Sequence, residues 1–281
     1  MKNLKLLEIL SLILIASSSF YFFSRPNNLY PKPSPSSPTT PTVLATQELQ
    51  EKINPRHFYA PILLYHHIAK VSIQNSYYVS PEIFDKQMEW LKENGFTVIS
   101  FDDFILAPQT EGALPPKPVM ITFDDSLRDQ YLEAFPILKK YGYTATFFIK
   151  LNNVDKSKNT LNWPDIQELA AAGNIIGSHS LNHDNMSRMN KKKLETELLE
   201  SKKIIEENIG HSVKYFSYPG GAYSQQTIEA VKAAGYLAAV TTRHRVWQEI
   251  TNSDDLFTLP RVHIDDEIPT FIDWIQGINL Q

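Results

Sequence analysis

Short apolar runs alternate with longer segments of helical spacing from about residue 60 onward. The runs are almost continuously apolar, which is typical of strands that are buried on both faces of a parallel sheet. They predict seven strands, at residues 62–65, 97–100, 119–122, 144–149, 174–176, 215–217 and 237–241. Apolar residues at helical spacing, bounded by a capping residue and a glycine, also predict three helices. These run from Ser80 to Gly95, from Asn190 to Gly210 and from Ser224 to Gly235.

This alternation predicts an α/β fold with parallel strands inside and helices outside. The folded part, residues 54–281, is somewhat shorter than the roughly 250 residues of an eight-fold (β/α) barrel. We therefore expect an incomplete (β/α) barrel. In such folds the reactive groups sit at the carboxyl ends of the strands, in the loops that follow them.

The first 53 residues have a different pattern. Lys2 and Lys5 precede an apolar stretch that ends at Phe23, which predicts an export signal peptide or a retained membrane anchor over residues 1–25. Both alternatives stay open. Residues 26–53 are rich in Pro, Ser and Thr and predict a linker. We expect an exported protein, periplasmic or extracellular, which the N-terminal segment would anchor to the membrane if it is retained.

Composition narrows the possible functions. The net charge of −4 over 281 residues provides no basic surface for nucleic acid. No cysteine is present, so disulfides and thiolate metal sites are excluded, and any metal ligands must come from His, Asp and Glu. Nothing in the composition indicates an oligomeric state.

Two adjacent carboxylates, Asp124 and Asp125, follow the apolar strand predicted at residues 119–122. Successive side chains of a strand point to opposite faces, so the two acids should have different roles. Two carboxylates beside an apolar core resist ionisation unless a cation neutralises them. His179 and His183 follow a later strand, four residues apart, and on a helical turn this spacing puts both imidazoles on one face. Asp125, His179 and His183 therefore form a candidate metal site.

Each of these motifs has an ordinary structural explanation when it stands alone. Adjacent aspartates commonly cap a helix or lie in a solvated turn, and Pro219 followed by Gly220 is first of all a turn. His66, just after the first predicted strand, could be a satisfied core histidine. Their joint occurrence at the strand ends of one alternating fold favours a shared site.

These residues resemble two motifs of the polysaccharide deacetylases with a NodB homology domain, also known as carbohydrate esterase family four. Residues 122–125, Thr-Phe-Asp-Asp, are similar to the first motif, Thr-Phe-Asp-Asp-Gly, although Ser126 replaces the glycine. Residues 179–183 resemble the second motif, His-Ser/Thr-x-x-x-His or a close variant. The resemblance covers roughly residues 61–272.

The resemblance implies a role for each of these residues. Asp124 would be the general base, and a divalent metal ion would be bound by Asp125, His179 and His183. Zinc is the expected ion, with cobalt or nickel as alternatives. Such an ion lowers the pKa of bound water to about 7, and Asp124 would take the proton. The backbone N–H of Gly220 would help to stabilise the oxyanion formed from an acetamide.

The third motif of the family, Phe-Arg-x-Pro-Tyr-Gly, matches residues 216–221 only in part. Tyr218, Pro219 and Gly220 would line the substrate and oxyanion region. Ser217, however, stands where many members have the arginine that tethers the base.

The segments around His66 and His263 are similar to the branch of the family that includes poly-N-acetylglucosamine deacetylases. Arg261 could there replace the missing arginine beside Asp124. The departing amine needs a proton donor that titrates near neutral pH, and we expect His66 to fill that role, with His263 as the second candidate. The family's fourth motif, an Asp with a Trp, has only Trp247 as a weak counterpart.

The expected function is that of a metal-dependent hydrolase that removes N-acetyl groups from an N-acetylglucosamine-containing polysaccharide and releases acetate. Two alternatives remain open. The substrate could instead be peptidoglycan, chitin or xylan, and the departures at Ser126 and Ser217 would also suit a fold that binds a glycan without turnover. The presence of Asp124 together with all three metal ligands favours catalysis.

Overall fold

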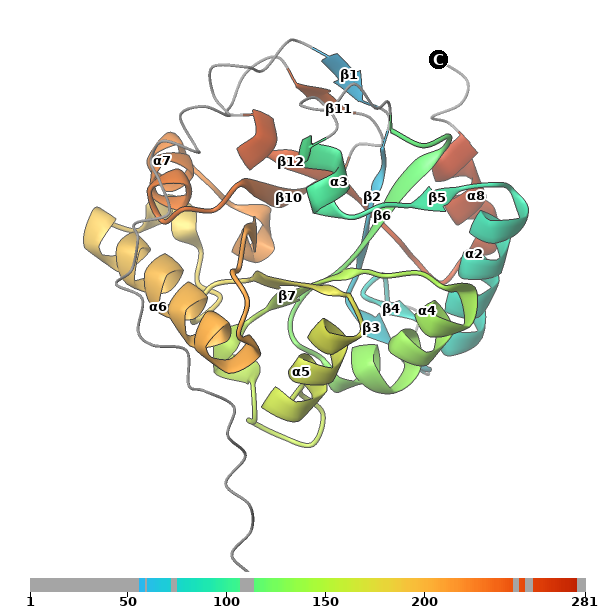
Figure 1. The fold of residues 1–281 in the computed structure, drawn as a ribbon, viewed down its shortest axis with the longest axis horizontal. Coiled ribbons are helices and arrows are strands. Elements are labelled where there is room, and N and C mark those ends of the chain that lie inside the picture. The colour runs from blue at the N-terminus through green and yellow to red at the C-terminus, as the bar shows by residue number, and fades with distance from the viewer. Residues whose placement is uncertain are drawn as a thin grey trace, which may run out of the picture. The chain divides into compact units, whose positions relative to one another are not determined.

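The apolar runs of the sequence build a closed ring of seven parallel strands (Figure 1). The computed structural model describes residues 56–58, 60–71, 75–106, 114–244, 248–250 and 255–276. Around the ring the strands follow the order β2, β12, β10, β9, β8, β7 and β6, and β6 pairs back onto β2. Their bounds are β2 Ile62–Tyr65, β6 Pro118–Phe123, β7 Thr146–Ile149, β8 Ile175–Ser178, β9 Tyr215–Ser217, β10 Ala238–His244 and β12 Leu259–His263.

The predicted incomplete barrel is confirmed, because the ring closes with seven strands instead of eight. Six of the seven predicted runs lie in the ring. The remaining run, predicted at 97–100, is the short strand β5 (Thr97–Val98), which pairs with β6 outside the ring. The seventh ring strand is β12, which the apolar pattern does not reveal because Pro260 and Arg261 interrupt it.

Helices cover the outside of the ring. The three predicted helices are α2 (Pro81–Glu93), α6 (Lys191–Ile209) and α7 (Gln225–Ala233). In Figure 1, α6 and α7 lie on one side of the barrel, while α2, α4 and α8 lie on the other. The helices that the apolar pattern does not predict are α3 Phe101–Leu106, α4 Phe135–Tyr141 with the π-helical turn Gln130–Ala134 before it, α5 Trp163–Ala171 and α8 Ile268–Gln276.

Aromatic side chains pack on both faces of the ring. On the outer face, Phe123 and Phe147 stack with their ring centroids 4.9 Å apart, and Phe123 packs against Phe84 of α2. On the inner face, a Cβ atom at Gly177 of β8 would lie 2.5 Å from the ring of Phe148 of β7. Only glycine therefore lets these two strands approach each other. Arg261 also lies inside the ring, where it is fully buried and its guanidinium carbon lies 5.7 Å from the Phe148 centroid.

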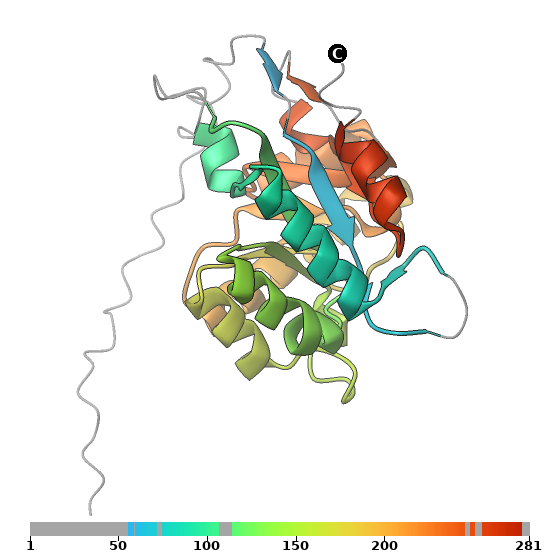
Figure 2. The same cartoon turned by 90° about the vertical axis from the view of Figure 1, so that its right-hand side faces the viewer.

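Between β2 and α2 the chain makes an excursion that projects from the barrel (Figure 2). The excursion carries a small pairing of β3 (His67–Ile68) with β4 (Tyr78–Val79). It returns beside the carboxyl end of β2, where the Tyr77 ring packs edge-on against His66, at 4.8 Å between centroids. One side of this end of the barrel is therefore walled by the excursion.

Outside the barrel, β1 (Arg56–Phe58) pairs antiparallel with β11 (Gln248–Ile250). Among the described residues, no helix combines the length and the apolar character needed to cross a membrane. The segments predicted as leader and linker, residues 1–25 and 26–53, and the weak motif counterpart Trp247 lie outside the described residues. Those assignments stay predictions.

Candidate active site

The side chains predicted to carry the chemistry gather at one end of the barrel. Parallel strands bring their carboxyl ends to the same rim, so loops that are distant in sequence meet there. The residues are His66 after β2, Asp124 and Asp125 after β6, His179 and His183 after β8, Tyr218 after β9, and His263 at the end of β12.

Three potential metal ligands converge at this rim. The Oδ1 atom of Asp125 lies 3.4 Å from His183 Nε2 and 3.8 Å from His179 Nε2. Ligands held about 2.1 Å from a zinc ion at tetrahedral angles are about 3.4 Å apart, so the spacing fits one shared ion. The Oδ1 atom is buried and has no hydrogen-bond partner, which is costly without a cation. The donor set therefore fits a divalent metal, and it is the one such cluster found among the described residues.

The two imidazoles are prepared for this role by their surroundings. His179 Nδ1 lies 2.7 Å from the carbonyl oxygen of Ser217 and must donate to it, because a carbonyl only accepts. The proton is thereby fixed on Nδ1, and Nε2 presents its lone pair towards Asp125. Burial, together with the nearby His179 ring, lowers the pKa of His183, which favours the neutral ligand form.

The loop that carries both histidines is not the helical turn predicted from their spacing. Residues 179–183 are neither helix nor strand, and Ser180 and His183 have left-handed backbones with φ of 64° and 65°. The Ser180 hydroxyl accepts the His183 N–H at 2.9 Å, which closes the loop into a tight turn. The histidines meet because the chain folds back, with ring centroids 4.7 Å apart.

Asp124 has partners quite different from those of Asp125. It is 1% exposed, and the Arg261 guanidinium grips it with two bonds, of 2.9 Å to Oδ1 and 2.5 Å to Oδ2. The Ser217 hydroxyl donates to Oδ2 at 3.0 Å and accepts from Arg261 at 3.0 Å. The adjacent aspartates therefore face an arginine and a histidine pair, respectively, as expected from their positions after a strand.

This clamp controls the charge of Asp124. Burial by itself would raise the pKa of the carboxyl group, but the Arg261 guanidinium and the His179 ring outweigh it. The pKa of Asp124 falls well below its usual range, so the carboxylate is ionised at neutral pH.

The two candidate proton donors lie together on the rim. The His66 and His263 rings are 5.4 Å apart between centroids, and Tyr77 packs edge-on against both. Burial lowers the pKa of His66 to about 4, even though Asp124 and Asp125 act in the opposite direction. Burial also lowers the pKa of His263. Both rings are therefore neutral in the resting site at neutral pH, and His66 does not have the near-neutral pKa expected from the sequence.

The predicted oxyanion turn follows β9. Pro219–Gly221 forms a single tight turn in which Gly220 has a left-handed backbone, φ 59°. The Tyr218 N–H donates to Val240 O at 3.1 Å, and the Gly221 N–H donates to Tyr218 O at 2.8 Å. Of the backbone donors in this turn, Gly220 is the one without a protein acceptor among the described residues.

Comparison with known proteins identifies the relatives of this arrangement. The family model for polysaccharide deacetylase matches residues 111–239. The Bacillus subtilis (strain 168) protein YxkH, whose name places it among polysaccharide deacetylases, is 34% identical over 182 residues, which are 65% of this chain and 64% of YxkH. The chain is therefore similar to the polysaccharide deacetylases over residues 111–239. It spans just under two thirds of the length of YxkH.

Two further relatives extend the likeness over more of the chain. A poly-beta-1,6-N-acetyl-D-glucosamine N-deacetylase of Staphylococcus aureus is 25% identical over 249 residues, 79% of this chain and 84% of that protein. The structure of the Streptococcus pyogenes deacetylase PplD, solved in complex with acetate, superposes with a TM-score of 0.70 at 27% identity. That match covers 76% of this chain and 95% of PplD.

The departures from the polysaccharide deacetylase motifs are each compensated in the structure. Ser126, in place of glycine, has a left-handed backbone with φ 57°. Its buried hydroxyl accepts the Lys150 N–H at 2.8 Å, which offsets the strain of roughly 1–2 kcal/mol at such a position. Ser217, in place of arginine, leaves room for the Arg261 side chain that arrives from β12.

One residue that joins the site has no motif to reveal it. Gln130, at the start of the π-helical turn, is buried, and its amide nitrogen donates to His66 O at 3.0 Å and to Asp124 O at 2.5 Å. It ties the loops after β2 and β6 together. A π-helical turn frequently marks a functional position, but it cannot be recognised from this sequence alone.

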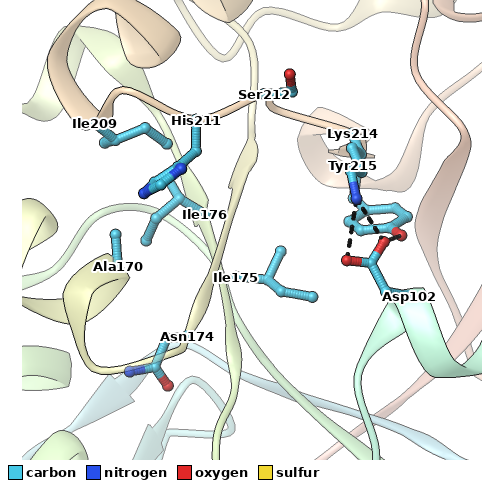
Figure 3. Close-up of a pocket in the computed structure, with 10 residues that line it drawn as sticks. All are labelled: Asp102, Ala170, Asn174, Ile175, Ile176, Ile209, His211, Ser212, Lys214 and Tyr215. Atoms are coloured by element: carbon cyan, nitrogen blue, oxygen red, sulfur yellow. Dashed lines mark hydrogen bonds and ion pairs between the residues drawn. The ribbon is translucent and has the colours of Figure 1, made fainter.

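The opposite end of the barrel has a pocket of about 320 Å³ that contains none of the predicted site residues (Figure 3). It lies at the amino ends of β8 and β9, where Asp102 faces Lys214 and Tyr215. Lys214 Nζ lies 3.0 Å from Asp102 Oδ1, and the Tyr215 hydroxyl donates to the same atom. In barrels of this kind the amino ends serve stability, and the chemistry lies at the carboxyl ends.

Proposed function

We propose that this chain is a metal-dependent hydrolase that removes N-acetyl groups from an N-acetylglucosamine-containing polysaccharide and releases acetate. The observation that carries the proposal is the pairing of two adjacent aspartates with different partners on one rim. Asp125 faces two histidines, while Asp124 is clamped by Arg261. Carboxylates in different environments can divide the tasks of holding an ion and moving a proton.

The ion would be held by Asp125, His179 and His183. Imidazole and carboxylate ligands suit zinc, with cobalt and nickel as alternatives. When bound, the ion would supply a water of lowered pKa and a positive charge beside the amide carbonyl. The N–H of Gly220 would donate to the oxyanion that develops on that carbonyl, in a region lined by Tyr218 and Pro219.

Asp124 would take the proton of the attacking water. The Arg261 clamp makes Asp124 a weak base, but it also makes the protonated carboxyl a strong acid that passes its proton on readily. His66, with a pKa of about 4, is neutral at rest and can receive this proton. The protonated His66 would then donate this proton to the departing amine, because the amine is a stronger base than the His66 ring. His263, on the same rim, is the second candidate for this step.

The relatives support one substrate class. The name of the Staphylococcus aureus relative specifies poly-beta-1,6-N-acetyl-D-glucosamine, and its match covers 84% of that protein. This supports the same polymer here, with peptidoglycan, chitin and xylan as alternatives. A glycan-binding role without turnover has less support, because Ser126 and Ser217 both have defined partners beside an intact base.

The test is acetate release by the full chain loaded with zinc, cobalt or nickel. We expect the highest kcat/KM on β-1,6-linked N-acetylglucosamine oligomers, and lower values on chitin oligomers, peptidoglycan fragments and acetylated xylan. Release of acetate only from one of the other substrates would reassign the polymer. No release from any of them at full metal occupancy would leave only the binding role.

The N-terminal segment also leads to a proposal about location. A lysine-flanked apolar leader followed by a Pro-rich tether supports export, with the catalytic domain close to the outer face of the membrane. Cell fractionation should then find the protein in the membrane or extracellular fraction. Full-length protein in the cytosol would contradict export.

A further inference from the structure

A buried carboxylate lies beneath the loop that carries both histidine ligands. Glu197, in the middle of α6, is 1% exposed. Its Oε2 atom accepts the backbone N–H of Leu181 at 3.1 Å and that of Asn182 at 2.8 Å. Its Oε1 atom accepts from the Asn182 side chain at 2.6 Å. All of these donors lie between His179 and His183, and no motif or resemblance assigns Glu197 a role.

The loop needs to be held from outside. It is neither helix nor strand, and Ser180 and His183 have left-handed backbones that side-chain-bearing residues adopt at a cost. On one side its carbonyl groups are held by the chain after β7, since Leu151 N–H donates to Ser180 O and Asn152 N–H donates to Leu181 O. On the other side its N–H groups are held by Glu197. The carboxylate completes a two-sided clamp.

We propose that Glu197 is a positioning residue for the metal centre, which fixes the loop so that both imidazoles face Asp125. This inference rests on the proposed metal site. A carboxylate is suited to the task because its two oxygens can accept all three N–H groups at once. A buried carboxylate is stable only when it accepts hydrogen bonds such as these three, whereas a charged side chain on the exposed face of a helix is stabilised by water. Outer-sphere groups of this kind commonly change metal affinity by about 10–100-fold.

The experiment measures zinc affinity of the metal-free full chain by calorimetry, alongside its thermal unfolding in chelator. Glu197→Ala removes all three bonds, and Glu197→Asp withdraws the carboxylate by one methylene. Both should weaken zinc binding at least about tenfold. Glu197→Gln keeps an oxygen for the two backbone N–H groups and should stay within about threefold of the wild type. If Glu197→Ala does not fold, Glu197→Asp carries the test.

The matched control is Leu198→Ala. Leu198 is the next residue on α6 and is fully buried, so its truncation should lower the unfolding temperature and leave zinc affinity unchanged. The inference is overturned if the wild type binds zinc and the Ala and Asp variants of Glu197 bind it equally well. It is also overturned if Leu198→Ala weakens binding as much as they do. Absence of zinc binding by the wild type would instead remove the metal site itself, and this inference with it.

Discussion

The two ends of the barrel carry polar clusters of opposite character. At the amino ends, four polar groups that line the pocket of Figure 3 have partners close by. Asp102 binds Lys214 and Tyr215, and the Asn174 side chain bonds the Ala145 N–H and Leu169 O. At the carboxyl ends, two buried atoms of the site, Asp125 Oδ1 and His66 Nδ1, have no hydrogen-bond partner among the described residues.

Strained backbone conformations are also concentrated at the carboxyl ends of the barrel. Among the described residues, six non-glycine positions have positive φ, and four of them belong to the site at the carboxyl ends: Asp125, Ser126, Ser180 and His183. Such conformations persist only where the surrounding structure holds them, and they concentrate at functional sites. The contrast teaches that a polar cluster by itself is not a sign of chemistry. Unpaired ligand atoms on a strained backbone are the more informative sign.

The largest expected effect comes from removing the proposed metal ligands. The double variant His179→Ala, His183→Ala leaves Asp125 alone, so metal occupancy should fall to background and acetate release with it. Metal analysis of the purified protein measures the first, and an acetate assay the second. His211→Ala, at the pocket of the opposite end, is the matched control and should keep its metal. Unchanged occupancy in the double variant would show that the site is placed wrongly.

The next effect is that of the base. Asp124→Asn keeps the shape of the side chain but removes the proton acceptor, so turnover should fall by about 10²–10⁴-fold. The metal should remain bound, because Asp124 is not one of the three ligands. Asp129→Asn is the control, since Asp129 is also a carboxylate near the rim but is paired with His67 at 2.6 Å. Loss of metal from Asp124→Asn would mean that the roles of the adjacent aspartates are exchanged.

Much of this contrast can be predicted from the sequence, and the exceptions have physical causes. The aspartate pair is recognisable because an apolar strand ends directly before it. Strand β12 is not, because Pro260 and a buried Arg261 break its apolar run, and only pairing with β2 and β10 makes it a strand. The partnership of Arg261 with Asp124 spans 137 residues, a separation at which local patterns carry no information.

The loop at residues 179–183 is a second exception, because here the local spacing predicts the wrong structure. A spacing of four residues suggests one face of a helix, yet the structure brings the two rings together through left-handed residues. Ser180 and Glu197 hold this conformation through hydrogen bonds, and hydrogen bonding of this kind has no periodicity to detect. The candidate ligands can therefore be proposed from residue type, while the geometry of their loop cannot.

A smaller effect is expected for the proton donor. His66→Ala should lower turnover by about a hundredfold or more with the metal retained. Because the pKa of His66 is about 4, its ring is already neutral between pH 6 and 8, and the loss should be uniform across that range. His263→Ala should cost much less, and pH-rate profiles of both variants provide the comparison. His263 would be assigned as the proton donor if His263→Ala lost more turnover than His66→Ala. The same assignment would follow if the pH-rate profile had a limb near neutral pH that disappears in His263→Ala.

The smallest effect on activity is expected at the amino ends. Asp102→Ala leaves the buried Tyr215 hydroxyl without its acceptor, which should lower the free energy of unfolding by about 1–3 kcal/mol. The Lys214 pair adds little, because both of its side chains are about 40% exposed, at 43% and 42%. Denaturant unfolding measures the change in stability, and kcat/KM should stay within about twofold of the wild type, as for other substitutions remote from a site.

A tenfold or greater fall in kcat/KM with the fold intact would contradict the assignment of stability to one end of the barrel and chemistry to the other. The pocket at the amino ends would then have to communicate with the rim, through β8 or β9, the two strands that run from the pocket to the histidine loop and to the oxyanion turn.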